Sequence, residues 1–197
     1  MAADRNSLKQ YVREHLSLPR FLHSLRTAEL SVELADRFGI SREEAEIAAL
    51  SHDMAREFPS QQIMNLAEED ALPILSEERQ RPVLLHGRAA AVLLQNNWGE
   101  TRTSVLQAVR RHTQGDSDMG AVGFIVYVAD SIERGRSHIS EEFRQGILHM
   151  DSMEQMVLSI AEDQIMYLSE RDIPVSERTK GLVRSISGGL HAVVQIG

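Results

Sequence analysis

The stretch Glu43-Glu44-Ala45-Glu46-Ile47-Ala48-Ala49-Leu50-Ser51-His52-Asp53 is the part of the sequence that decides the expected fold. Ser41 precedes it, and Ser41 followed by Glu44 is the pattern of a capping box, in which the hydroxyl accepts from an amide of the first turn and the carboxylate reaches back. Apolar residues then recur at helical spacing. The predicted helix ends on the polar pair His52-Asp53, in a place where the pattern favours burial.

The same helical periodicity continues over most of the chain. Further helices are predicted at residues 6–16, 20–38, 60–66, 83–97, 101–113 and 119–132, with two or three more between 140 and the end, broken at 171–174. Residues 72–82 are the least regular and are expected to form a loop over the site. No alternating strand pattern persists, so the sequence predicts an all-α single domain, with a core at about 18–135 and helices at about 140–190 packing on it.

Composition limits the classes of function. The 197 residues include no cysteine, which excludes disulfides, thiolate ligands and a cysteine nucleophile and favours a cytoplasmic protein. The net charge of −8 argues against a nucleic-acid partner, because phosphate contacts need a basic footprint. The polar start predicts no signal peptide, and the longest uncharged stretch, 119–129, is shorter than the ~20 residues of a spanning helix. No membrane partner is therefore expected.

Six polar residues fall where the apolar pattern calls for buried positions: His23, His52, Asp53, His86, His112 and Asp130. Imidazole and carboxylate without thiolate suit iron, manganese, cobalt, nickel or zinc. Four imidazoles and two carboxylates are enough for two metal ions that share one carboxylate, and such a pair activates water against phosphate esters. His52 and Asp53 are adjacent and diverge by roughly 100° on a helix, which suits His52 on one ion and Asp53 between the two.

Simpler explanations exist for each residue taken alone. A single histidine on an apolar face, such as His23, is more often a core residue than a ligand. Asp130 is also placed to pair with Arg134, one helical turn later. The six residues together favour the metal site. The remaining histidines lack that context and are expected to be surface or structural residues: His15, His138, His149 and His191.

Five segments carry a family resemblance: His23-Ser24-Leu25-Arg26, His52-Asp53-Met54-Ala55-Arg56-Glu57-Phe58-Pro59, Leu85-His86-Gly87, His112-Thr113-Gln114-Gly115 and Tyr127-Val128-Ala129-Asp130-Ser131-Ile132-Glu133. Their order resembles the HD-domain metal-dependent phosphohydrolase superfamily, in particular its binuclear members. More narrowly, they look like the bacterial YqeK-type family of symmetrical diadenosine tetraphosphate hydrolases. The resemblance covers about residues 6–184.

The resemblance implies an HD fold, a di-iron centre and cleavage of diadenosine tetraphosphate into two ADP. It implies that one metal is held by His23, His52, Asp53 and Asp130. It also implies that His86 and His112 hold the other, with Asp53 bridging. The chain departs from the family at Arg56, where Lys is frequent, at Arg134, where Pro is common, and in residues 87–90 and 114–118.

The expected mechanism is in-line attack on phosphorus by a hydroxide that bridges the two metals. Arg56, one turn past His52, is the first candidate for a catalytic phosphate contact. Arg26, Arg134 and Arg136 are further candidates for substrate binding. Each of these arginines could instead be a solvated cation at a helix end.

Two other functions stay open at this point. The first is an HD phosphohydrolase for another nucleotide, such as an alarmone or a deoxynucleotide; a cyclic dinucleotide is disfavoured because no Gly-Tyr-Pro segment occurs. The second is a regulatory module that binds metal without turnover. The sequence leaves open the native metal, the physiological nucleotide and whether the protein forms a homodimer.

Overall fold

The computed structural model describes residues 4–194, with side chains to residue 188. Within that range the chain forms only helices, as predicted, and no strand. In chain order they are α1 (Arg5–His15), α2 (Leu18–Phe38), α3 (Arg42–Ser51), α4 (Ser60–Glu68), α5 (Ser76–Gln80), the 3-10 helix η1 (Pro82–Leu85), α6 (His86–Trp98), α7 (Thr103–Arg111), α8 (Gly120–Ile132), α9 (Glu141–Leu148), α10 (Met153–Ser169) and α11 (Glu177–Val194).

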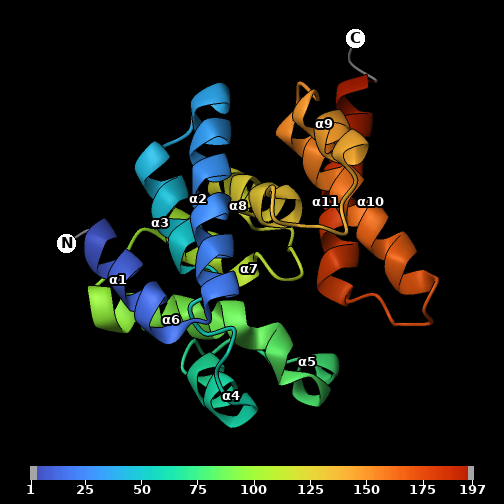
Figure 1. The fold of residues 1–197 in the computed structure, drawn as a ribbon. Coiled ribbons are helices and arrows are strands. Elements are labelled where there is room, and N and C mark those ends of the chain that lie inside the picture. The colour runs from blue at the N-terminus through green and yellow to red at the C-terminus, as the bar shows by residue number, and fades with distance from the viewer. Residues whose placement is uncertain (1–3, 195–197) are drawn as a thin grey trace.

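Helix α2 stands in the middle of the molecule, with α3 beside it and α6 crossing near its lower end (Figure 1). Pro19 lies in the first turn of α2, where its missing N–H costs nothing. Gly39 ends the helix with a φ of 67°, a left-handed conformation that favours glycine. The long α2 thereby turns sharply into α3, and the two helices pack against each other.

The buried apolar side chains form two clusters that meet at α2, α3 and α8. The first joins α1, α3, α4, α6 and α7 and includes Leu8, Ile47, Ile63 and Leu94. The second joins α8 to α9, α10 and α11 and includes Ile132, Ile147, Met156 and Leu182. Helix α8 contributes to both clusters. Helices α9, α10 and α11 lie on the side of α8 that faces away from α1 (Figure 1). This arrangement is a single all-α domain.

The capping box predicted at the start of α3 forms only in part. Ser41 Oγ accepts from the amide of Glu44 at 3.3 Å, as expected. The Glu44 carboxylate instead accepts from Ser104 Oγ at 2.6 Å. The expected return contact is therefore wrong, because a hydroxyl of α7 offers this carboxylate a tertiary partner.

The prediction of a loop at residues 72–82 is also wrong in part, because α5 lies within it. Glu78 caps that short helix by accepting from the amide of Leu75 at 2.8 Å. Arg88 of α6 is buried, and it donates to two carbonyl oxygens of the segment before α5, Pro73 O at 2.9 Å and Leu72 O at 2.8 Å. These bonds fasten the segment to α6.

Two of the shifts in the predicted helix ends concern histidines. The helix predicted from residue 83 begins at His86, after the 3-10 turn. The helix predicted to reach residue 113 ends at Arg111, so His112 caps it. No helix in the described part of the chain is long and apolar enough to cross a membrane.

Candidate metal centre

His52 and Asp53 lie at the end of α3, as the sequence predicts. The helix ends at Ser51, His52 is its C-cap, and Asp53 stands in the turns that follow. The Nδ1 atom of His52 is 2.6 Å from the carbonyl oxygen of Ala49, three residues back. A ring that donates from Nδ1 in its neutral form leaves a lone pair on Nε2. His52 therefore presents Nε2 as a ligand atom.

His86 and His112 repeat this local geometry. Nδ1 of His86 is 2.6 Å from Val83 O, and Nδ1 of His112 is 2.8 Å from Val109 O. In each case the acceptor is the carbonyl three residues earlier, at the boundary of a helix. This bond fixes the ring orientation and the tautomer, as is usual for histidines that bind metals.

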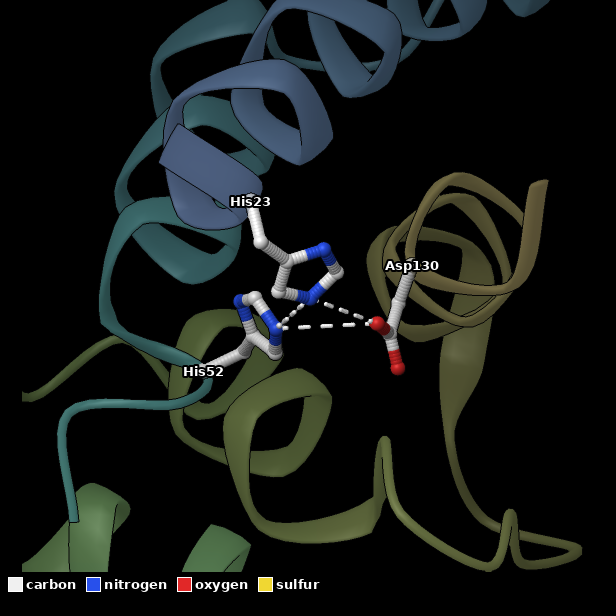
Figure 2. Close-up of side chains that lie close together, drawn as sticks. All are labelled: His23, His52 and Asp130. Carbon is white, nitrogen blue, oxygen red and sulfur yellow. Dashed lines mark hydrogen bonds and ion pairs between the residues drawn. The ribbon is translucent and has the colours of Figure 1, made fainter. Parts of the chain in front are cut away.

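The first group of ligand atoms comes from α2, α3 and α8 (Figure 2). Nε2 of His23 lies 3.2 Å from Nε2 of His52 and 3.0 Å from Oδ1 of Asp130. The distance from His52 Nε2 to the same carboxylate oxygen is 3.7 Å. Oδ2 of Asp53 is 3.8 Å from His23 Nε2 and 3.7 Å from His52 Nε2. These atoms surround one point.

The second group involves the other oxygen of Asp53. Nε2 of His86 and Nε2 of His112 are 2.9 Å apart. Oδ1 of Asp53 lies 3.0 Å from the former and 3.7 Å from the latter. Asp53 therefore faces a different pair of imidazoles with each of its two oxygens, and all six residues singled out in the sequence are brought together.

The donor set fits divalent metal ions. In the second group both rings donate from Nδ1 to backbone carbonyls, so two Nε2 lone pairs face each other in a buried place. No proton is left to join them when the rings are neutral. A cation between these two nitrogens would remove the repulsion between their lone pairs. Imidazole together with carboxylate suits iron, manganese, cobalt, nickel and zinc.

The ionisation of these groups also fits ligation. Burial lowers the pKa of His52 to about 4, and burial lowers the pKa of His86 as well, so both rings are neutral at neutral pH. Burial raises the pKa of Asp53, but the facing imidazoles of His52, His112 and His86 outweigh it, and the pKa lies well below its ordinary value. Asp53 is therefore an anion. Metal ligands need these protonation states.

Gly87 allows the close approach of α6 and the end of α7. A Cβ atom at this position would lie 2.7 Å from Val109 O and 3.0 Å from Nδ1 of His112. Any side chain here would push against the bond that orients His112. The sequence places Gly87 in the motif with His86, but this role becomes visible only when the two helices are packed.

Three of the four arginines predicted to bind substrate lie near the ligand groups. Arg136 donates to the Asp130 carboxylate and, through Nε, to Asp130 O at 2.8 Å. Arg26 donates to Glu133. Arg56 is half-buried, and within the described residues its side chain has no hydrogen bond or ion pair. Its pKa is lowered by burial, while Asp53 acts in the opposite sense.

The alternative pairing of Asp130 with Arg134 is wrong. Helix α8 ends at Ile132, so Arg134 does not stand one helical turn beyond Asp130, and it is exposed. Arg136 takes that place because the chain turns back after the helix. His15, His138 and His149 are exposed, as expected; the side chain of His191 lies outside the described residues.

Two residues near the ligands were missed by sequence reasoning. Arg20 Nη1 donates to Oδ2 of Asp53 at 2.9 Å. Glu133 faces Nδ1 of His23 at 3.1 Å. Arg20 stands three residues before His23 on one helix, and that spacing was a usable signal. For Glu133, the sequence offers no signal beyond its presence in the last motif.

Comparisons with known proteins agree with this geometry. A family model described as HD domain matches residues 20–135. The chain is 29% identical to the symmetrical bis(5'-nucleosyl)-tetraphosphatase of Bacillus subtilis (strain 168), over 85% of this chain and 87% of that protein. It is 26% identical to the protein of the same name from Staphylococcus aureus (strain NCTC 8325 / PS 47), over 87% and 88%.

A crystal structure from Clostridium acetobutylicum, described as a predicted HD superfamily hydrolase involved in NAD metabolism, has the same fold. The TM-score is 0.87 at 24% sequence identity, over 95% of this chain and 99% of that one. The resemblance to the HD-domain superfamily, drawn from the five sequence motifs, is confirmed by the family-model match over residues 20–135.

Proposed function

Since the chain belongs to the HD domain family and is an HD-domain hydrolase, we propose that it cleaves diadenosine tetraphosphate symmetrically into two ADP. One observation carries the proposal: the two oxygens of Asp53 face two separate groups of imidazoles, His23 with His52 and His86 with His112. This is the donor arrangement that a two-metal phosphohydrolase needs. The names of the relatives supply the substrate.

In this proposal His23, His52, Asp53 and Asp130 hold one divalent ion. His86 and His112 would hold a second, and Asp53 would offer one of its two oxygens to each ion. Iron is proposed for both positions, on the family resemblance. Bound ions would supply an activated water and positive charge beside the phosphoryl oxygens.

The residues of the chain prepare the site in three ways. The backbone carbonyls of Ala49, Val83 and Val109 hold the imidazoles with their lone pairs inward. Asp53 sets the separation of the two positions. Burial excludes bulk water from the ligand atoms, which would strengthen their interaction with bound cations.

Arg56 is our choice for the main phosphate contact. Its guanidinium is half-buried and has no anionic partner of its own among the described side chains, so a substrate phosphate would complete its hydrogen bonds. Arg136 stands at the edge of the first group and is a second candidate. Arg26 and Arg134 are less suited, because one is bonded to Glu133 and the other is exposed beyond α8.

We also infer that the whole chain works as one HD domain in the cytoplasm. Residues 140–190 then serve to cover α8, which carries Asp130, and to keep that helix in place.

Product analysis by chromatography tests the function. Protein loaded with Fe²⁺ or Mn²⁺ is incubated with diadenosine tetraphosphate, a guanosine tetraphosphate alarmone and dATP, each in a separate reaction. ADP as the sole product of the first substrate, with slower turnover of the others, supports the proposal. ATP with AMP, or preference for the alarmone or dATP, would overturn it. The Asp53→Asn variant is the control for contaminating hydrolases.

A further inference from the structure

Glu133 lies directly after α8 and is almost completely buried, with 2% of its surface exposed. It belongs to neither group of ligand atoms. Its Oε1 atom lies 3.1 Å from Nδ1 of His23. A buried carboxylate needs partners that offset the loss of hydration.

Three donors hold Glu133 in place. Nε and Nη2 of Arg26 donate to its two oxygens, the second at 3.2 Å, and the amide of Gly135 donates to Oε2. A Cβ at Gly135 would overlap the Arg26 guanidinium, so a larger residue here would require the Arg26 side chain to shift. Burial raises the pKa of Glu133, but the hydrogen bonds from His23, Arg26 and Gly135 bring it down to about 2.

His23 therefore differs from the other three imidazoles. Nδ1 of His52, His86 and His112 faces a neutral backbone carbonyl. Nδ1 of His23 faces a fixed carboxylate. A charged acceptor makes a stronger hydrogen bond, orients the ring and makes the other nitrogen a better electron donor. The group that contains His23 also offers Asp130, a second carboxylate, whereas the His86 group has only Asp53.

We propose that Glu133, clamped by Arg26 and the Gly135 amide, is a positioning residue for His23 and makes the His23–His52–Asp130 position the tighter of two metal positions. Arg26 then acts through Glu133 and does not contact substrate. The inference rests on the metal centre of the proposed function but not on the identity of the nucleotide.

The test measures Mn²⁺ affinity in two backgrounds that each keep one position. His86→Ala leaves the His23 position, and Asp130→Ala leaves the His86 position. Binding is followed without oxygen by the electron paramagnetic resonance signal of free Mn²⁺. The first background is expected to bind Mn²⁺ more tightly than the second. Adding Glu133→Gln is expected to weaken binding about 10- to 100-fold in the first background only.

Glu100→Gln is the matched control. Glu100 is equally buried, with 1% exposed, and Arg102 donates to both of its oxygens, as Arg26 does to Glu133. It lies between α6 and α7, where the amides of Thr101 and Arg102 also donate to its Oε1 atom. A general loss of stability from neutralising a clamped carboxylate would appear in both variants. Equal Mn²⁺ affinity with and without Glu133→Gln would overturn the proposal.

Arg26→Met gives a second, independent route, because it leaves Glu133 in the chain. In the His86→Ala background, Arg26→Met is expected to weaken Mn²⁺ binding. In the otherwise unchanged protein at saturating metal, it is expected to leave KM unaltered. A raised KM with unchanged Mn²⁺ affinity would instead make Arg26 a substrate contact and overturn the inference. Because the affinity measurement contains no nucleotide, it stays informative even if diadenosine tetraphosphate is not the substrate.

Discussion

Oδ1 of Asp53 lies 3.0 Å from Nε2 of His86, although Asp53 follows the end of α3 and His86 begins α6. The other oxygen of Asp53 faces His23 and His52 at 3.8 and 3.7 Å. One carboxylate thus joins two groups of imidazoles, one from α2 and the end of α3 and the other from α6 and the end of α7.

Asp53→Asn should abolish turnover while the fold persists. The amide keeps the shape of the carboxylate but removes the charge and offers only one oxygen, so it cannot face both groups as an anion. We expect kcat to fall by at least about 10²-fold and the metal content to drop. Activity assays and circular dichroism check these outcomes together. Full activity in the variant would rule out the bridging role.

Gly87→Ala should disturb the His86–His112 position and spare the other. The added Cβ would meet Val109 O at 2.7 Å and the His112 ring at 3.0 Å. Metal content per chain should therefore fall towards one. Gly146→Ala is the matched control, because Gly146 also lies in a helix and a Cβ there meets nothing within 4 Å. The same metal content in both variants would refute the packing argument.

Arg56→Met should impair catalysis without impairing stability. Because no protein group bonds its guanidinium in the described residues, its removal leaves no buried partner unsatisfied. We expect kcat/KM to fall about 10- to 100-fold, which corresponds to about 1.4–2.7 kcal/mol of transition-state binding. Thermal unfolding should change little. Arg13→Met, on the exposed side of α1, is the control for removing one positive charge. Equal kcat/KM in the two variants would exclude Arg56 as a phosphate contact.

Removing metal should lower the melting temperature. Without cations the Nε2 atoms of His86 and His112 remain 2.9 Å apart with no proton between them. Metal present at about 100 times its Kd stabilises the folded state by about 2.7 kcal/mol per site. For a chain of this size that corresponds to a shift of about 5–10 °C for each site that is emptied. Differential scanning calorimetry with and without a chelator measures it, and an unchanged melting temperature would contradict metal binding by these residues.

Local patterns were enough to predict the helices and the residues that gather at the candidate metal centre. Apolar spacing identified α2, α3 and α8, and the unusual polar residues His23, His52 and Asp130 stood out because they interrupt that spacing. The end of α2 at Gly39 was also readable, since glycine is the residue that adopts a left-handed cap most easily.

Tertiary contacts explain what the sequence did not reveal. The Glu44 carboxylate does not make the expected capping contact, because it accepts a hydrogen bond from Ser104 of α7 instead. The contact between Arg26 and Glu133 joins residues more than 100 positions apart, so no local sequence pattern predicts it. Arg136 replaced Arg134 beside Asp130 because α8 ends at Ile132, and sequence methods place helix ends only within a few residues.

Metal analysis of the protein purified without oxygen tests the central claim most directly. Two groups of donors that share Asp53 predict about two divalent ions per chain, measured by inductively coupled plasma mass spectrometry against protein concentration from amino-acid analysis. The account also predicts about one ion per chain in His86→Ala. A wild-type value of one or less after reconstitution with Fe²⁺ would contradict it.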